Sequence, residues 1–286
     1  MKKSTLLHLR IPFSFFLLPV FLLAVAISTE AHTQNLVLAF LTLHFLVYPA
    51  SNGYNSYFDK DTGSIGGLKH PPQVSKELYW TSLLLDFVAL CLGMFISLEF
   101  TVMIFIYGVI SKAYSHPSVR LKKYPVLGWL AAGLFQGYFT FLLSFIAINN
   151  ISISEVWNWS IQLPGVLSTL LLLGSYPMTQ IYQHEEDTRR GDVTISKKLG
   201  ILGTFHFTAI TFLLSSSGFF YFFTEYYTLI KGVLFLSSML PVLVYFTWWY
   251  LQVRQDEQKA DFTSTMRLNF VSATMLNGYF IYLWIS

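Results

Sequence analysis

Charge is the property that this sequence has least of. Charged residues make up 12% of the 286 residues, about half the share of a typical soluble protein. So few charges cannot cover a water-facing surface, which excludes a soluble globular enzyme. The net charge of +3 is small and scattered, so it does not indicate a nucleic-acid partner. A single cysteine, Cys91, excludes a disulfide scaffold or a cysteine-built zinc site.

Apolar residues are abundant instead. They make up 54% of the chain, and the 27 Phe, 17 Tyr and 7 Trp exclude a disordered protein. A helix needs about 20 mostly apolar residues to cross a bilayer, and nine segments are candidates, although Glu99 alone separates the third from a short fourth. We therefore predict an all-α polytopic membrane protein with one domain over residues 1–286. The segments cover residues 11–28, 36–54, 80–98, 100–110, 127–148, 163–182, 201–223, 228–251 and 268–285.

The basic residues support this count of nine helices. Short cytoplasmic loops of membrane proteins are enriched in Lys and Arg. With nine spans, 17 of the 18 basic residues fall on one side of the membrane, and Lys231 alone falls on the other. We therefore predict a cytoplasmic N-terminus and an outer C-terminus. The short loops favour a bacterial inner membrane.

The first polar constellation lies within residues 52–63, where the second segment leaves the membrane. Asn52, Asn55 and Asp59 stand at helical spacing on one face. Asp61 follows two residues later, and the chain then breaks at Gly63 into a glycine-containing loop. No phosphate-loop pattern is present there, so we interpret these glycines as a hinge.

A second polar constellation follows the sixth segment, within residues 179–194. Gln183 and Asp187 lie at i, i+4 on one face, with Glu186 beside them, and Gly191 is expected to end the helix. Both acidic ends lie on the same predicted side of the membrane. Mg²⁺ prefers carboxylate and carbonyl oxygens and usually bridges to substrate phosphates, so the two ends together favour Mg²⁺.

Basic residues lie between the two acidic ends in the chain. Arg120, Lys122 and the nearby Lys112 suit phosphate oxygens, as does Arg190 in the second constellation. Each of these groups taken alone could equally be a solvated loop charge or a determinant of topology. Together they predict a diphosphate site. Asp86, inside the third segment, is either a functional group or a structural hydrogen-bonding partner.

These residues resemble the UbiA-type intramembrane prenyltransferase family over nearly the whole chain. Asn55 and Asp59 match the first half of the family's Asn-x-x-x-Asp-x-x-x-Asp motif, whose last position falls at Gly63. In the second motif, Asp187 matches and the first Asp position holds Gln183. Residues 114–122 resemble the family's diphosphate-contacting loop, and Asn269 resembles a family position more weakly. Arg190, Gly191 and Thr194 also match the second motif.

The resemblance implies a Mg²⁺-dependent transfer of a prenyl group from an allylic polyprenyl diphosphate to a hydrophobic acceptor, usually aromatic. The prenyl tail would lie between helices that are open to membrane lipid. The resemblance and the site chemistry together nominate three groups of residues. Metal ligands are Asn55, Asp59 and Asp187, then Asp61, Gln183 and Glu186; diphosphate contacts are Arg120, Lys122, Arg190 and Lys112; Asp59 and Asp187 are catalytic; Asn52, Tyr114 and Asn269 are further candidates.

Three other functions stay open at this stage. A membrane terpene cyclase would use the same ionisation and quench the cation within one molecule. A non-catalytic relative would bind isoprenoid lipid without releasing diphosphate, and Gly63 and Gln183 motivate that reading. A transporter is less favoured, because Asp86 and Lys231 are the only ionisable candidates for a pathway through the membrane.

Overall fold

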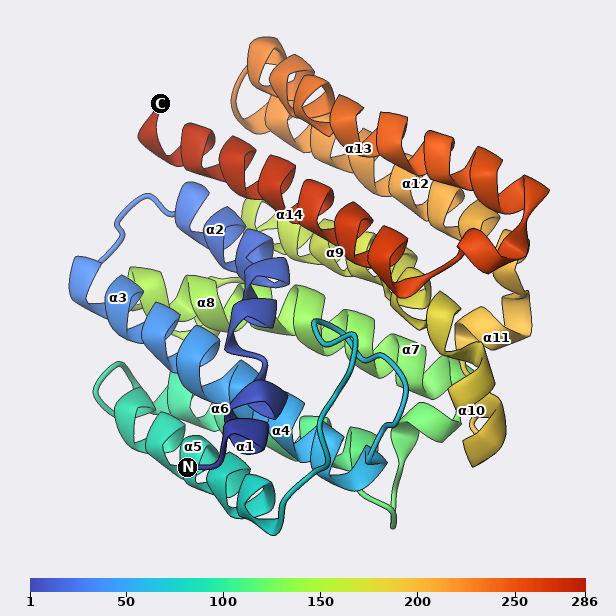
Figure 1. The fold of residues 1–286 in the computed structure, drawn as a ribbon. Helices are drawn as coiled ribbons and strands as arrows, with labels where there is room; N and C mark the ends of the chain where they lie inside the picture. Colours follow the sequence, from blue (N-terminus) through green and yellow to red (C-terminus); the bar gives the residue numbers. More distant parts are fainter.

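The protein folds into a bundle of helices. The computed structural model describes residues 1–286 and contains no β-strand, apart from one isolated bridge between Ile65 and Leu68. The long helices run roughly side by side, as Figure 1 shows. The α-helices are α1 (Lys3–Leu9), α2 (Leu18–Ala26), α3 (Thr33–Leu41), α4 (Tyr48–Asp59), α5 (Lys76–Gly93), α6 (Leu98–Ser115), α7 (Pro125–Leu134), α8 (Thr140–Asn149), α9 (Trp159–Ser175), α10 (His184–Arg190), α11 (Ile195–Leu199), α12 (Ile201–Tyr226), α13 (Leu229–Gln255) and α14 (Phe262–Ile285).

Short 3₁₀ and π turns continue several of these helices. The π turns η2 and η4 join α3 to α4 and α7 to α8, and the 3₁₀ turn η6 joins α9 to α10. Each of these three runs is therefore one continuous helix. The short turns are η1 (Ile11–Phe16), η2 (Thr42–Val47), η3 (Leu121–Lys123), η4 (Phe135–Phe139), η5 (Ile153–Glu155), η6 (Tyr176–Gln183) and η7 (Glu257–Lys259).

Six helices are long and apolar enough to cross a membrane, and a seventh span is possible if the bent pair at the N-terminus counts as one. The pair consists of Lys3–Phe16 and Leu18–Ala26, which meet at 41°. Helices α5 and α14 occupy two further predicted segments but are too polar to count as membrane spans on the same basis. Charged Lys76, Glu77 and Asp86 lie in α5, and polar side chains interrupt α14. The all-α class is confirmed, and the count of nine spans stays a prediction.

The predicted boundary between the third and fourth segments is wrong in position. Helix α5 ends at Gly93 and α6 begins at Leu98, so Glu99 lies in the first turn of α6. The Glu99 carboxylate accepts hydrogen bonds from the Ser152 hydroxyl at 2.9 Å and from the Ile153 N–H at 3.0 Å. Glu99 therefore anchors the loop after α8 to the start of α6, which a reading of hydropathy alone does not reveal.

The chain changes direction at the ends of the two polar helices. Lys60, just after α4, adopts a left-handed conformation with φ 50°, and the segment from Asp61 to Ser75 then forms a loop. Gly191 ends α10 with φ 70°, as the sequence predicts. In Figure 1 α10 lies at one end of the bundle and the C-terminus at the other.

Candidate active site

A polar cavity of about 220 Å³ lies where the two acidic helix ends meet. Its wall comes from α4, α6, η3, α7, η4, η6 and α10, from the turn after α1, and from the loops after α4 and α10. The two acidic constellations are more than a hundred residues apart in the chain, and the fold brings them to one place. Ten of the predicted site residues line this cavity: Asn52, Asn55, Asp59, Asp61, Tyr114, Lys122, Gln183, Glu186, Asp187 and Arg190.

The first acidic segment places its side chains on the inner face of α4. Asp59 is 9% exposed and forms an ion pair with Lys122 from the basic loop. The Asn55 Oδ1 atom accepts a hydrogen bond from the Ser115 hydroxyl at the end of α6. The ion pair and the hydrogen bond together fix the end of α4 against the α6–α7 connection.

Asp61 turns back toward the cavity because Lys60 redirects the chain. Its carboxylate lies 2.5 Å from the Arg190 guanidinium, which also contacts Glu186 at 3.0 Å. Burial raises the pKa of Asp61, and the negative charge of Asp59 raises it further, against the opposing effect of Arg190 and Lys122. The Asp61–Arg190 pair therefore joins the first acidic segment to the second.

Residues of the second acidic segment hold both the cavity wall and the loop after α4. The Asp187 carboxylate accepts a hydrogen bond from the Thr194 hydroxyl at 3.1 Å. The Gln183 Nε2 atom donates to the Ser64 carbonyl at 3.0 Å. A Cβ atom at Gly63 would lie 3.4 Å from Glu186 Oε2. The two departures from the family motif, Gly63 and Gln183, therefore lie on one side of the cavity.

The predicted diphosphate contacts separate into three places. Lys122 and Arg190 line the polar cavity, whereas Arg120 lies beside it and holds Asp192 through two hydrogen bonds of 2.8 and 3.2 Å. The structure does not bring Lys112 to the cavity. Its ammonium pairs with Asp86 of α5 instead, so Asp86 has a structural partner rather than a place at the site.

One basic residue of the cavity was missed by the sequence reasoning. Arg10 lies at the joint between α1 and η1 with φ 47° and is 8% exposed. Its guanidinium donates to the carbonyl oxygens of Gly66 at 3.1 Å and Asn52 at 3.3 Å. In the sequence, Arg10 is one of the basic residues that predict a cytoplasmic N-terminus. A basic residue directly before an apolar segment is the one signal that could have nominated it.

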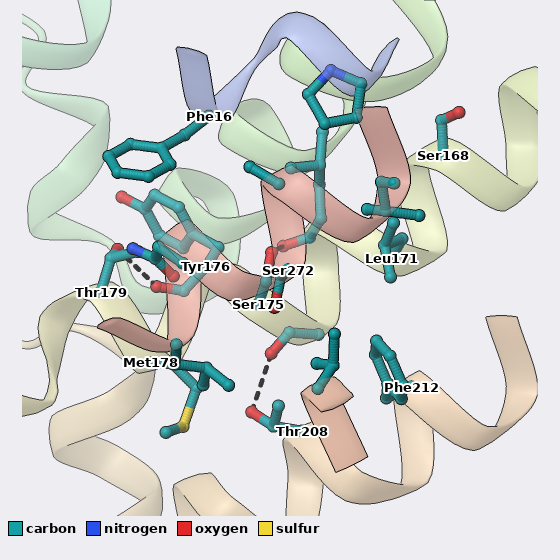
Figure 2. A pocket seen from close by; sticks show the side chains of 18 of the residues that line it. Phe16, Ser168, Leu171, Ser175, Tyr176, Met178, Thr179, Thr208, Phe212 and Ser272 are labelled. Carbon is teal, nitrogen blue, oxygen red and sulfur yellow. Dashed lines mark hydrogen bonds between the residues drawn. The ribbon is translucent and has the colours of Figure 1, made fainter. Parts of the chain in front are cut away.

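A second, larger cavity of about 630 Å³ continues from the polar one. Of its 39 lining residues 25 are hydrophobic, and none is charged. Figure 2 shows part of its wall, where Phe16, Leu171 and Phe212 face the space. Asn269, a further candidate from the sequence, lines this cavity and not the polar one. Seven residues line both cavities and therefore border the passage between them: Phe13, Ser51, Asn52, Tyr107, Gln136, Tyr176 and Thr179.

Comparison with known proteins now assigns the chain to a family. A model of the UbiA prenyltransferase family matches residues 16–271, which is most of the chain. The chain belongs to the UbiA prenyltransferase family. It is accordingly an integral membrane protein with several spans, and the resemblance drawn from its motifs is confirmed. A search of curated protein sequences finds no match to this family member.

Solved structures of UbiA homologues share its fold. A homologue from Archaeoglobus fulgidus, bound to DMAPP and Mg²⁺, superimposes with a TM-score of 0.72 at 17% identity, covering 99% of each chain. The apo structure of a homologue from Aeropyrum pernix K1 gives a TM-score of 0.72 at 16% identity, covering 96% of this chain and 99% of the other. A structure of digeranylgeranylglyceryl phosphate synthase gives 0.62 at 18% identity, covering 99% of each.

Proposed function

We propose that this UbiA family member transfers a prenyl group from an allylic polyprenyl diphosphate to a lipid-soluble acceptor. The observation that carries the proposal is the pair of joined cavities. One is small and lined by carboxylates and basic groups, and the other is larger and free of charge. A molecule with a diphosphate head and a long apolar tail matches this pair. We propose the whole chain, residues 1–286, as one domain built around it.

The polar cavity supplies oxygen ligands of the kind that Mg²⁺ prefers. We propose Asn55, Asp59 and Asp187 as principal ligands, with Asp61, Gln183 and Glu186 as secondary ones. No three carboxylate, histidine or cysteine side chains lie close enough to hold a metal ion by themselves. This fits an ion that completes its shell with water and with the diphosphate of the substrate. Two structures of an Archaeoglobus fulgidus homologue contain Mg²⁺ together with DMAPP or GPP, which supports the choice of metal.

The basic side chains complement the diphosphate charge. We propose that Lys122 and Arg190 contact its oxygens directly, while Arg120 positions the loop through Asp192. In this structure Lys122 pairs with Asp59 and Arg190 with Asp61, so binding of the diphosphate and the metal would exchange these partners. Mg²⁺, when bound, neutralises charge that develops on the leaving group.

The reaction then needs little covalent help from the protein. The bond between the allylic carbon and the diphosphate oxygen breaks, and its electron pair leaves with the diphosphate. An electron-rich carbon of the acceptor bonds to the allylic cation, and the acceptor loses one proton. We propose an aromatic acceptor, such as a quinone precursor, because its ring supplies that carbon. The reaction would occur at the cytoplasmic face of a membrane, with a bacterial inner membrane as the proposed location.

The experiment that tests this function measures diphosphate release by purified protein in lipid. Allylic diphosphates of increasing chain length are supplied with a crude lipid extract, with and without Mg²⁺. We expect metal-dependent release that is lost in Asp59→Asn, because the amide removes a charged ligand and the partner of Lys122. Retained helicity and membrane insertion of the variant are the control. Unchanged activity in Asp59→Asn would reject this site assignment.

The same assay separates the two alternatives that the site still permits. One alternative is a non-catalytic relative that binds isoprenoid. It is supported by the partners that the site residues already have within the protein, since Asp59 and Asp61 form ion pairs and the Gln183 amide donates to the Ser64 carbonyl. Bound isoprenoid without diphosphate release from any substrate would support that function. Release that yields a cyclic hydrocarbon without acceptor would support a terpene cyclase.

A further inference from the structure

The passage between the two cavities contains two polar side chains that have no partner in the protein. Four of the seven residues at the passage use their polar side chains internally: Ser51 with Ser111, Asn52 with the Leu9 carbonyl, Tyr176 with Tyr114, and Thr179 with the Tyr176 carbonyl. Phe13 is apolar. The Gln136 carboxamide and the Tyr107 hydroxyl make no hydrogen bond.

Tyr107 is held at the passage by burial. Its side chain is 5% exposed, and its ring packs against Tyr48 with 6.1 Å between centroids. Tyr107 borders both cavities and its hydroxyl has no partner in the protein, so a polar group of a ligand in the passage can form its hydrogen bond.

Gln136 is held at the passage by the π turn η4. The turn leaves the Tyr138 N–H free for the Thr169 hydroxyl in α9, at 2.8 Å, and the Thr140 hydroxyl donates to the Phe135 carbonyl at 2.7 Å. Gly137 packs directly on the backbone of Thr169. Single π turns occur often at functional sites, because they rotate one side chain out of the regular helical register. Here the rotated register brings Gln136 to the wall of both cavities.

The charges around the passage restrict what these two groups can bind. The apolar cavity has no charged lining residue. The polar cavity has three basic ones, and all are engaged: Lys122 by Asp59, Arg190 by Asp61 and Glu186, and Arg10 by backbone carbonyls. Arg10 has no carboxylate partner, but the lining of this cavity holds five carboxylates against these three cations: Asp59, Asp61, Glu186, Asp187 and Asp192. A carboxylate on the acceptor would therefore meet net negative charge, and burying it there would be costly.

We infer that Gln136 and Tyr107 bind the acceptor, and that the acceptor is a neutral molecule with a hydroxyl or carbonyl oxygen, not a carboxylate. This inference rests on the proposed function, since the passage is where the allylic carbon of a bound diphosphate would lie. The Tyr107 hydroxyl donates or accepts one hydrogen bond, and the Gln136 carboxamide does both. Neither group takes up a proton at neutral pH, so both are positioning residues.

The test compares two probes that differ by one carboxylate, 1-naphthol and 1-hydroxy-2-naphthoate. Binding of each to the full chain in lipid nanodiscs is measured by fluorescence, with empty discs subtracted for partition into lipid. We expect 1-naphthol to bind at least about tenfold more tightly than the carboxylate. Equal or tighter binding of the carboxylate, or no saturable binding of 1-naphthol, overturns the inference.

Substitutions locate the bound probe. Gln136→Leu and Tyr107→Phe should each weaken 1-naphthol about fivefold, because each removes one hydrogen bond. Tyr138→Phe is the matched control, since Tyr138 belongs to the same π turn, lines neither cavity and bonds to Gln162. Wild-type affinity in both passage variants would overturn the assignment, and if a variant fails to fold, the comparison of probes on the wild type still decides.

Diphosphate release separates this inference from the proposed function. Metal-dependent release together with a preference for the carboxylate probe would reject the neutral acceptor and leave the prenyltransferase in place. Absence of release with every allylic diphosphate would reject the prenyltransferase itself, and the acceptor site with it.

Discussion

At the residue scale, Asp192 in the cavity wall and Arg120 just outside it hold the two halves of the site together. Arg120 adopts a left-handed conformation with φ 44°, and its planar guanidinium grips the Asp192 carboxylate through two hydrogen bonds. Asp192 follows Gly191 at the end of the second acidic segment. The contact therefore sets the distance between the basic loop and the acidic end, although Arg120 itself does not line the cavity.

Substitution of Arg120 should lower activity without changing the charge of the residues that line the cavity. Arg120→Lys keeps the positive charge but loses the planar guanidinium that donates two hydrogen bonds to Asp192. We therefore expect kcat/KM for diphosphate release to fall about tenfold. Asp192→Asn breaks the same contact and also removes a carboxylate from the cavity wall, so it should lower kcat/KM at least as much. The double variant should lose little more than Asp192→Asn alone. Arg189→Lys is the control, because Arg189 is 67% exposed on the same helix end. Losses that multiply in the double variant would show that the two residues act separately.

Asp61 gives the site a pH dependence of stability. Burial and the neighbouring Asp59 charge raise its pKa, whereas in the unfolded chain the value is about 3.9. A raised folded pKa means that its protonated form adds stability below about pH 3.9, which is lost as pH rises through the folded value. We expect the melting temperature of the wild type, relative to Asp61→Asn in detergent, to fall from pH 4 to pH 6. A relative increase over that interval would contradict this.

At the scale of elements, the π turn η4 requires close contact with α9. A Cβ atom at Gly137 would lie 2.6 Å from the Thr169 Cα atom, where backbone cannot yield easily. The position of Gln136, the side chain that η4 contributes to the passage, depends on this approach, because the Tyr138 N–H of η4 donates to the Thr169 hydroxyl of α9.

Gly137→Ala should therefore push η4 away from α9. We expect a loss of about 1–3 kcal/mol in the free energy of unfolding and a lower melting temperature in detergent. Gly278→Ala is the matched control, since a Cβ there meets no atom within 4 Å. A Gly137→Ala variant as stable as the control would mean that the contact between η4 and α9 relaxes without cost.

The whole molecule raises the question of how many times the chain crosses the membrane. Six or seven helices satisfy length and apolarity, while α5 and α14 fall below, yet the alternation of basic loops predicts nine crossings. Polar groups inside α5 and α14 explain the difference. Asp86 of α5 pairs with Lys112 of α6, and α14 packs between other helices, so neither helix needs a fully apolar surface.

Reporter fusions check the crossing number directly. We expect alkaline phosphatase fused after Ser286 to be active in a bacterial host and a fusion after Gln255 to be inactive. The reason is that α14, the predicted ninth span, lies between the two fusion points, and the N-terminus is predicted to be cytoplasmic. Green fluorescent protein at the same two positions should give the reverse pattern. Fluorescence after Ser286 would establish an even number of spans and place the C-terminus in the cytoplasm.

Much of the site could be predicted because its acidic residues sit at helical spacing. Asn52, Asn55 and Asp59 share a face of any helix that includes them, and the same holds for Gln183 and Asp187. The basic residues were less predictable. Lys112 is near the site in sequence but lies within α6, where Asp86 is the nearer partner, whereas Arg10 is far in sequence and reaches the cavity through a left-handed joint.

The sequence by itself determined the all-α class, the membrane environment and the family. These depend on composition, on runs of apolar residues and on motif spacing, all of which can be recognised in the linear sequence. Tertiary structure alone decided which charges neutralise each other, which polar groups stay unpartnered at Gln136 and Tyr107, and that the polar cavity opens into a charge-free one. Electrostatic and hydrogen-bonding partners depend on distances of a few ångströms between helices far apart in the chain, and no pattern within one segment specifies those distances.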